Sequence, residues 1–289
     1  MDIPNPSPGT GWKPSPLLKA SGVLHLGAAT ATLAQPRSWL YALGAVAANH
    51  VLLAATGLWP RSTWLGSNWT HLPPAAAARN EVAITIDDGP EPEVTPAVLA
   101  LLAEHQARAT FFCIGERVDR HPALARAIVA RQHEIGNHTY RHLMRFSLLG
   151  PRGLAQEIGR AQEAIGTATG EVARFFRAPA GLRNPFLEPV LRRANLQLVS
   201  WTRRGFDTVS GSAGRVLDSL TRDLQGGDIL LLHDGHAART SSGSPVILEV
   251  LPRLLQALAA AQLASITLRA ALARSSVPPQ LSAASGVPT

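Results

Sequence analysis

The sequence predicts an α/β fold built on a parallel sheet and preceded by an N-terminal membrane hairpin or anchor. From about residue 80 onward, short apolar runs typical of strands alternate with longer helical patterns. Some of these runs end on polar residues, among them Asp87, Asp88 and His233, and chemistry at the carboxyl ends of strands is typical of a barrel opening. Before residue 60, by contrast, the chain is apolar and almost free of charge.

The N-terminal region divides into a tail and one or two apolar segments. Residues 1–16 are rich in proline and are expected to form a flexible tail. The run from Ser38 to Trp59 holds no charged residue and is long enough to cross a hydrocarbon core of about 30 Å. We therefore interpret residues 17–60 as one or two membrane helices. A hairpin turning at Gln35-Pro36-Arg37 is preferred over a signal-peptide core at Ala20–Ala34, and a buried core helix is the other alternative.

Two polar residues, Asn49 and His50, interrupt the second apolar run and would be tolerated if they faced another helix. Basic residues lie on both sides of the apolar runs, so charge does not fix the orientation. Two spans would place the N-terminus and the α/β domain on the same side of the membrane, whereas one span would separate them.

After this region the elements follow in order. Residues 61–79 are expected to be a linker, residues 80–274 one domain, and residues 275–289 a disordered tail rich in Ser, Pro and Ala. Strands are expected at Val82–Ile86, Ala109–Ile114, a short run before His138, Leu196–Trp201, Ile229–His233 and Ser265–Leu268. Helices are expected at Thr95–His105, Pro122–Arg131, Gly153–Thr167, Pro185–Arg193, Ala213–Leu224 and Val246–Ala261.

The composition limits the classes of partner that the protein can have. The net charge is +7, carried almost entirely by scattered arginines, which suits either an anionic surface or an ordinary solvated surface. The absence of a Lys/Arg-rich run argues against nucleic acid. The single cysteine, Cys113, excludes an intrachain disulfide framework and is expected to be buried in a strand.

Two segments carry the chemistry, Thr85-Ile86-Asp87-Asp88-Gly89 and His138-Thr139-Tyr140-Arg141-His142. One carboxylate and two imidazoles form a common ligand set for a catalytic divalent metal, and the second carboxylate is then free to act as a base. Alone, adjacent aspartates also suit a solvated turn, and histidines four residues apart also share a helix face. Three further segments follow in order: Arg177-Ala178-Pro179-Ala180-Gly181, Trp201 with Asp207, and Leu230-Leu231-Leu232-His233.

In this order the five segments resemble the motifs of the NodB-type polysaccharide deacetylases, carbohydrate esterase family 4. The resemblance extends across roughly residues 80–235. It implies a distorted, incomplete (β/α) barrel of about seven strands. It also implies that Asp88, His138 and His142 bind a divalent metal, with zinc expected first and cobalt, nickel or manganese also suited to this ligand set.

The resemblance also assigns roles to the remaining motif residues. Asp87 would be the general base, with Arg177 pairing with it and orienting it. His233 would be the general acid for the departing amine, and Asp207 would hydrogen-bond His233 and stabilise its imidazolium. The expected substrate-binding residues are Tyr140, whose backbone N–H would be an oxyanion donor, and Pro179 and Gly181, which would shape a loop. Trp201 is expected to be a pocket wall or a core aromatic residue.

Two features depart from the family pattern. Many members that act on polymers carry an aromatic residue where this chain has Ala180, which puts chitin-oligomer activity in doubt. Arg203 and Arg204, between Trp201 and Asp207, could bind a phosphate or carboxylate of the substrate or could face solvent. The remaining histidines of the domain are expected to be surface or structural residues: His105, His121, His133 and His236. Because His236 follows His233 closely, a supporting role beside the site is an alternative for it.

The predicted function is metal-dependent N-deacetylation of an N-acetylated sugar in a cell-envelope glycan or lipid-linked glycan. Alternatives are a deacetylase or deformylase of a polyprenyl-phosphate aminosugar, hydrolysis of another amide or ester, and a non-catalytic glycan-binding barrel. The expected partners are the glycan or lipid-linked aminosugar and a membrane, without nucleic acid, and the protein is expected to be a monomer. The expected location is a bacterial-type inner membrane, with the catalytic domain facing the periplasm or exterior.

Overall fold

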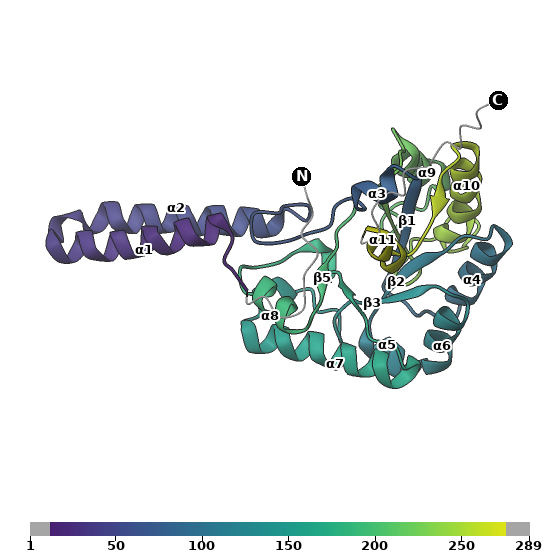
Figure 1. Cartoon of the computed structure of the whole chain (residues 1–289), viewed down its shortest axis with the longest axis horizontal. Coiled ribbons are helices and arrows are strands. Elements are labelled where there is room, and N and C mark those ends of the chain that lie inside the picture. Colours follow the sequence, from purple (N-terminus) through teal and green to yellow (C-terminus); the bar gives the residue numbers. More distant parts are fainter. Residues whose placement is uncertain (1–11, 276–289) are drawn as a thin grey trace, which may run out of the picture.

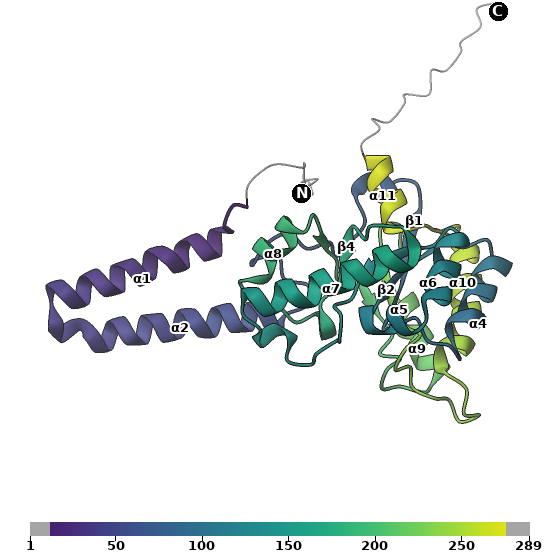
Figure 2. The ribbon, with the colours of Figure 1, turned by 90° about the horizontal axis from the view of Figure 1, so that it is seen from below.

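The computed structural model describes residues 12–275. The two apolar runs form helices α1 (Pro16–Ala34) and α2 (Trp39–Leu58), joined by the 3₁₀ turn η1 (Pro36–Ser38). They lie side by side and extend from one side of an α/β domain (Figures 1 and 2). The end of α2 meets the domain, where the backbone N–H of Arg183 donates to the carbonyl of Gly57 at 3.1 Å. The turn falls where the sequence indicated a hairpin. The expected tails lie largely outside the described residues, at 1–11 and 276–289.

The hairpin turns polar side chains inward and apolar side chains outward. The amide of Asn49 donates to the hydroxyl of Ser21 at 2.8 Å, and both residues are buried between the helices. The rings of His50 and His25 meet edge to face, with centroids 5.2 Å apart. Asn49 and His50 therefore face the other helix, as a stable apolar hairpin requires, while much of the outer surface is exposed and apolar.

The domain is built on a curled half-barrel of parallel strands, which confirms the predicted fold class. The strand order is β5-β4-β3-β2-β1-β7-β6, and β8 (Ala264–Ser265) pairs with the start of β1. The edge strands β5 and β6 do not pair with each other, so the barrel stays open on that side. The strands in the order are β1 (Glu81–Asp87), β2 (Ala109–Cys113), β3 (Glu134–Asn137), β4 (Phe175–Phe176), β5 (Gln197–Leu198), β6 (Arg203–Arg204) and β7 (Ile229–His233).

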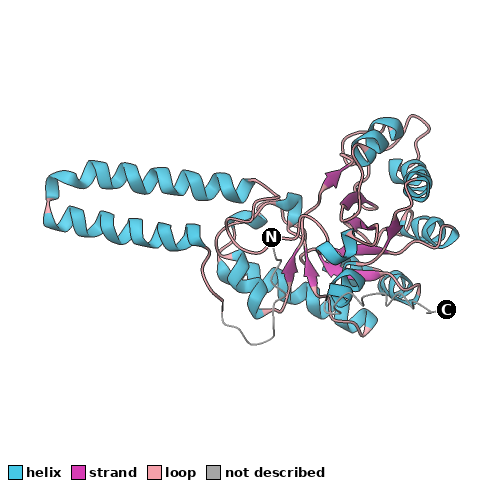
Figure 3. Ribbon diagram, turned by 45° about the horizontal axis from the view of Figure 1, so that its top comes forward, coloured by secondary structure: helices cyan, strands magenta, loops and turns pink. Residues whose placement is uncertain are grey.

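Helices cover the outer face of this sheet (Figure 3). Apolar side chains at alternate strand positions, such as Val82, Ile84 and Leu230, pack with the helices in one large hydrophobic cluster. The helices after α2 are α3 (Pro74–Ala77), α4 (Thr95–Glu104), α5 (Gly115–Arg120), α6 (Pro122–Ala130), α7 (Pro151–Thr169), α8 (Leu187–Arg193), α9 (Ala213–Thr221), α10 (Val246–Ala260) and α11 (Leu268–Ser275). Two further 3₁₀ turns are η2 (Phe146–Leu148) and η3 (Pro179–Gly181).

The same alternation aims the functional residues inward. In β1, Ile84 and Ile86 belong to the outer cluster, so Thr85 and Asp87 face the inside of the half-barrel. Asp87 is in register with His233 at the end of β7. Because all these strands are parallel, their carboxyl ends meet at one rim, which gathers side chains from distant parts of the sequence there.

The segment expected to be a linker packs into the domain instead. Trp69 is 2% exposed, forms a parallel bridge with Val199 and lies 5.4 Å from the ring of Phe175. Together with Leu72 and Ala76 it fills the inner side of the half-barrel. An isolated α/β domain would therefore need residues well before residue 80 to cover its inner core.

Several element predictions differ from the structure. The run Ser265–Leu268 is wrong as a strand, because pairing with β1 stops at Ser265 and Leu268 already begins α11. The expected strand Leu196–Trp201 contracts to Gln197–Leu198. The two-residue strands β4 and β6 and the short helices α3 and α5 were not predicted, since segments of this length show no periodicity.

Candidate active site

Asp87 is held by a buried arginine. Arg177 is fully buried, and its Nη1 donates to Oδ1 of Asp87 at 2.6 Å and to the hydroxyl of Thr85 at 2.9 Å. Its Nη2 donates to the carbonyl of Ser200 at 2.8 Å, its Nε to that of Val199 at 3.3 Å, and its guanidinium lies over the ring of Phe112. These contacts fix the position of the Asp87 carboxylate and place a positive charge against it.

Asp88, His138 and His142 converge on one point. The Nε2 atoms of both histidines lie 3.3 Å from Oδ1 of Asp88, and that buried oxygen has no hydrogen-bond partner among the described residues. The ligand atoms of the three residues all lie within 4.8 Å of one another. Ligands on a tetrahedral ion at about 2.0–2.1 Å would be about 3.4 Å apart, so this spacing and donor set fit a divalent metal.

The histidines sit in a loop after β3, not on a helix. Nδ1 of His138 donates to the carbonyl of Arg177 at 2.8 Å, which leaves its Nε2 lone pair free toward Asp88. The side chain of Asn137 accepts from the backbone N–H of Thr139 at 2.9 Å, and buried Glu157 on α7 accepts from the backbone N–H of Arg141 at 2.9 Å. The loop is thus tied to the strand before it and to α7.

His233 and Asp207 form a second buried pair. Nδ1 of His233 donates to Oδ1 of Asp207 at 2.8 Å, and the backbone N–H of His233 donates to Oδ2 at 2.7 Å. Burial lowers the pKa of His233, but the hydrogen bond and negative charge of Asp207 outweigh it and raise that pKa above its ordinary value. The imidazolium form is therefore favoured, as a general acid requires.

The titratable side chains of the ligand cluster shift one another's pKa. Burial would raise the pKa of Asp88, but the surrounding imidazoles hold it well below its usual range. Burial would lower the pKa of His138, but Asp87 and Asp88 raise it, whereas burial and the charge of His138 lower the pKa of His142 to about 4. The two carboxylates therefore favour positive charge at this point, and a bound cation would satisfy them.

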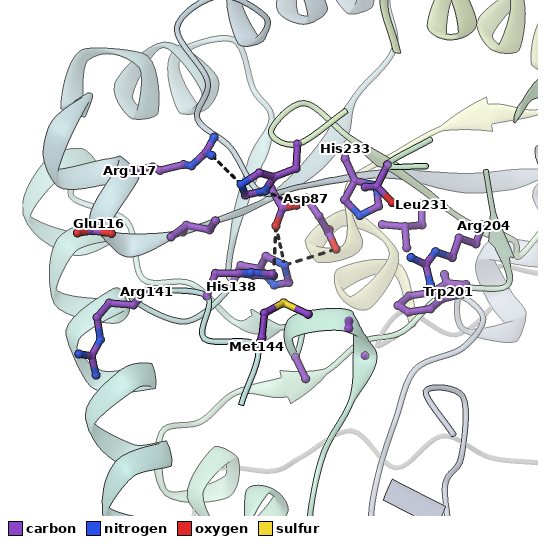
Figure 4. Close-up of a pocket in the computed structure, with 18 of the residues that line it drawn as sticks. Asp87, Glu116, Arg117, His138, Arg141, Met144, Trp201, Arg204, Leu231 and His233 are labelled. Carbon is purple, nitrogen blue, oxygen red and sulfur yellow. Dashed lines mark hydrogen bonds and ion pairs between the residues drawn. The ribbon is translucent and has the colours of Figure 1, made fainter. Parts of the chain in front are cut away.

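These groups line one open cavity of about 560 Å³. Figure 4 shows Asp87, His138 and His233 around it, with Trp201 and Arg204 at one end and Glu116 and Arg141 at the other. The remaining lining residues are Asp88, Ile114, Arg117, Arg120, His142, Met144, Ala178, Ala180, Gly181, Thr208, Leu231 and His236. A cavity of this size exceeds the needs of one acetyl group and suits a sugar chain or a sugar with an attached group.

One residue expected to be structural or on the surface belongs to this site. His236 lines the cavity, and its Nδ1 lies 3.1 Å from Oδ2 of Asp88, while its Nε2 lies 3.3 Å from Arg117. The left-handed turn after β7, with φ of +59° at His236, carries the ring back toward Asp88. The sequence signal was the proximity of His236 to His233, which gave no direction for the side chain.

The expected substrate-binding residues lie at the cavity or beside it. Gly181 and Trp201 line it, and Pro179 begins the 3₁₀ turn η3 that contains Gly181. The backbone N–H of Tyr140 makes no hydrogen bond within residues 12–275, which leaves it available as a donor. The phenol of Tyr140 turns away and donates to Asp119 at 3.0 Å.

The two arginines of β6 lie on opposite faces of the strand and have different surroundings. Arg203 binds Asp228 at 2.6 Å and the carbonyls of Arg222 and Asp223, so it is a structural residue and not a substrate ligand. Arg204 projects on the other side of the strand and lines the cavity.

Five residues of the site have a left-handed backbone conformation. Asp88, Thr139, His142, Ala180 and His236 all have positive φ, between +52° and +73°, although none is glycine. Such conformations cost about 1–3 kcal/mol each and persist where the surroundings impose them, which is common at functional sites.

A half-barrel whose rim combines two carboxylates, a buried arginine and histidines in this arrangement defines a hydrolase of the carbohydrate deacetylase class. The family model for polysaccharide deacetylases matches residues 75–199. A peptidoglycan-N-acetylglucosamine deacetylase of Bacillus cereus is 35% identical over 175 residues, covering 60% of this chain and 81% of that protein. A chitooligosaccharide deacetylase of Sinorhizobium fredii is 36% identical over 165 residues, covering 57% and 76%. The chain belongs to the polysaccharide deacetylase family, carbohydrate esterase family 4, and is a hydrolase acting on N-acetyl amide bonds.

Solved structures agree with this placement. A family 4 carbohydrate esterase from Streptomyces lividans in complex with acetate is 32% identical, with a TM-score of 0.58 over 64% of this chain and 91% of that chain. A family 4 pseudoenzyme from Bacillus anthracis shares the fold, with a TM-score of 0.61, 23% identity and coverage of 68% of this chain and 66% of that one.

Proposed function

We propose that this protein is a membrane-anchored, metal-dependent N-deacetylase of an N-acetylated sugar in a cell-envelope glycan or lipid-linked glycan. The observation that carries the proposal is one cavity lined by a candidate three-ligand metal cluster, by Asp87 and by His233. Buried behind its wall, Arg177 pairs with Asp87 and Asp207 pairs with His233. The presence of all these groups argues against a non-catalytic glycan-binding barrel.

The two buried pairs and the backbone of Tyr140 have distinct parts in hydrolysis. Held by Arg177, Asp87 takes the proton of the attacking water as that oxygen adds to the amide carbonyl carbon. His233, charged with the help of Asp207, gives a proton to the nitrogen as the C–N bond breaks, so acetate and the free amine leave. The N–H of Tyr140 faces the developing oxyanion.

The metal ligands in this proposal are Asp88, His138 and His142. A divalent cation bound there supplies Lewis acidity toward the amide carbonyl and the water. Zinc is the first candidate, and cobalt, nickel and manganese suit the same carboxylate and imidazole donors. His138 contributes Nε2 because the carbonyl of Arg177 occupies its Nδ1–H.

The exposed hairpin supports membrane attachment. Helix α2 has 20 residues and α1 has 19, which corresponds to about 30 Å of helix. Val23, Leu33 and Tyr41 are 72%, 83% and 84% exposed, so the helices are not the buried core of a soluble domain. Two spans would keep the N-terminus and the catalytic domain on one side, and we propose that this side is the periplasm or exterior of an inner membrane.

A lipid-linked aminosugar is the second candidate substrate, because the base of the hairpin meets the cavity wall. Pro60, just beyond α2, lies beside Gly181 and Trp201, so closely that a Cβ on Gly181 would be 2.6 Å from the Pro60 ring. The carbonyl of Pro60 accepts from the hydroxyl of Ser200 at 2.6 Å. The cavity thus lies near the point where the hairpin would leave the membrane, within reach of a sugar on a lipid carrier.

The test is a product assay on the full chain in detergent, because residues before 80 fill the inner core. Acetate and formate release would be measured from N-acetylglucosamine oligomers, peptidoglycan fragments and a polyprenyl-phosphate aminosugar, with and without a chelator. Chelator-sensitive acetate release supports the proposal, and the substrate that reacts fastest identifies the glycan. Formate release would favour the deformylase alternative. If metal is bound but no substrate reacts, the substrate assignment is wrong.

A further inference from the structure

The cavity is lined by four arginines, and they are not equivalent. Three of them are ion-paired with a glutamate: Arg117 with Glu91 at 2.7 Å, Arg120 with Glu116 at 2.8 Å and Arg141 with Glu157 at 2.6 Å. The fourth, Arg204, has no carboxylate within ion-pair distance in the part of the chain that the structure describes, and its buried Nε has no hydrogen-bond partner there.

The position of Arg204 is fixed by its strand. Arg203 and Arg204 pair with Leu230 and Leu231 of β7, so Arg204 shares the inner face with Leu231, two residues before His233. On the opposite face, Arg203 is anchored to Asp228, which is fully buried. The strand therefore presents Arg204 to the cavity without depending on a flexible loop.

Aromatic rings hold the guanidinium in place. Its central carbon lies 5.5 Å from the ring centroid of Trp201 and 5.0 Å from that of Phe206. Figure 4 shows the group beside Trp201, on the side of the cavity where Leu231 and His233 lie. A guanidinium ordered by aromatic neighbours keeps its planar set of N–H donors available and loses little entropy when it binds an oxyanion in a bidentate manner.

We propose that Arg204 forms a binding site for an oxyanion, a carboxylate or a phosphate, carried by the substrate next to the N-acetylated sugar. The inference rests on the proposed function for the identity of that sugar. An unpaired cation at the cavity wall would gain most from a charged partner, whereas a neutral sugar hydroxyl would be a weaker acceptor. The site would therefore select a charged glycan or a phosphorylated sugar over a neutral oligomer.

The test is direct binding to the full chain in detergent, measured by titration calorimetry, so that the result does not depend on turnover. The probes are neutral di-N-acetylchitobiose, a disaccharide of N-acetylglucosamine and N-acetylmuramic acid, and N-acetylglucosamine 1-phosphate. The variants are Arg204→Gln and Arg204→Lys, with Arg120→Gln as the matched control, because Arg120 lines the same cavity but is paired with Glu116. Thermal melting of each variant checks the fold.

We expect at least one anionic probe to bind about tenfold or more tightly than the neutral one, consistent with charge-assisted hydrogen bonds. Arg204→Gln should abolish this preference, Arg204→Lys should retain part of it, and Arg120→Gln should leave it within about twofold. Loss confined to the muramic acid probe assigns a carboxylate, and loss confined to the sugar phosphate assigns a phosphate. Equal binding of neutral and anionic probes, or a preference that survives Arg204→Gln, overturns the inference.

Failure of the proposed function gives a different result. If no acetate or formate is released from any substrate but the anionic preference still depends on Arg204, the binding site stands and the reaction assignment is wrong. If hydrolysis proceeds and the preference is absent, the reaction stands and the oxyanion site is wrong.

Discussion

Asp207→Asn is the most informative substitution in the acid pair. Asp207 is fully buried and accepts two hydrogen bonds from His233, one from the ring at 2.8 Å and one from the backbone at 2.7 Å. An asparagine has one acceptor oxygen, so it can satisfy only one of these donors, and it removes the negative charge that raises the pKa of His233. A hydrogen bond to a charged group contributes about 1.5–3 kcal/mol, so its loss should lower the pKa of His233 and weaken the imidazolium form.

The expected result follows from the sign of this shift. Because His233 must be protonated to act as the acid, lowering its pKa moves the alkaline limb of kcat/KM to lower pH. At a pH above the new limb, activity should fall by roughly ten- to hundredfold. The measurement is a pH profile of acetate release by the full chain.

A control with matched burial is Asp228→Asn, which alters another fully buried aspartate that pairs with Arg203 away from the reacting groups. It should reduce thermal stability and leave the alkaline limb in place. If Asp207→Asn keeps the wild-type limb and full activity, Asp207 does not tune His233, and the acid role argued for that pair is wrong.

Three other predictions concern the metal cluster, the buried arginine and the hairpin. Asp88→Ala should lower bound metal, measured by elemental analysis after dialysis, and unchanged metal content would refute the ligand assignment. Arg177→Met should destabilise the protein by about 3–5 kcal/mol in chemical unfolding, because it leaves the buried Asp87 without its cation, and Arg177→Lys should recover part of that loss. Asn49→Ala should cost only about 0.6 kcal/mol, the average for a hydrogen bond between membrane helices, so a large loss of folded protein would contradict a membrane-embedded hairpin.

Much of the fold follows from local pattern. The strand Ile229–His233 was predicted with its observed bounds, and the predicted Val82–Ile86 lies within β1, since these are apolar runs of strand length. The strands β4 and β6 were not predicted, because a segment of two residues shows no hydrophobic periodicity. These segments are strands only because they pair with neighbouring strands. Trp69 was assigned to a linker because nothing local shows that its ring fills the inner side of the half-barrel.

Some residues of the site could likewise be predicted from the sequence, and others could not. Asp87, Asp88 and the histidines of the loop were predicted from motifs whose order along the chain carries the information. The role of His236 depends on a left-handed turn that brings its ring to Asp88, and no pattern in the sequence specifies that turn. Arg203 pairs with Asp228 and Arg204 lines the cavity because successive side chains of a strand point to opposite faces. This difference could be recognised only once β6 was known.

The central claim is that two adjacent carboxylates have different tasks, with Asp88 holding the metal and Asp87 acting as the base. The most direct test compares Asp87→Asn with Asp88→Asn in the full chain, measuring bound metal and acetate release on the same samples. We predict that Asp87→Asn retains the metal and loses at least about a hundredfold in acetate release. Asp88→Asn should lose both. Acetate release at the wild-type rate by Asp87→Asn would contradict the account.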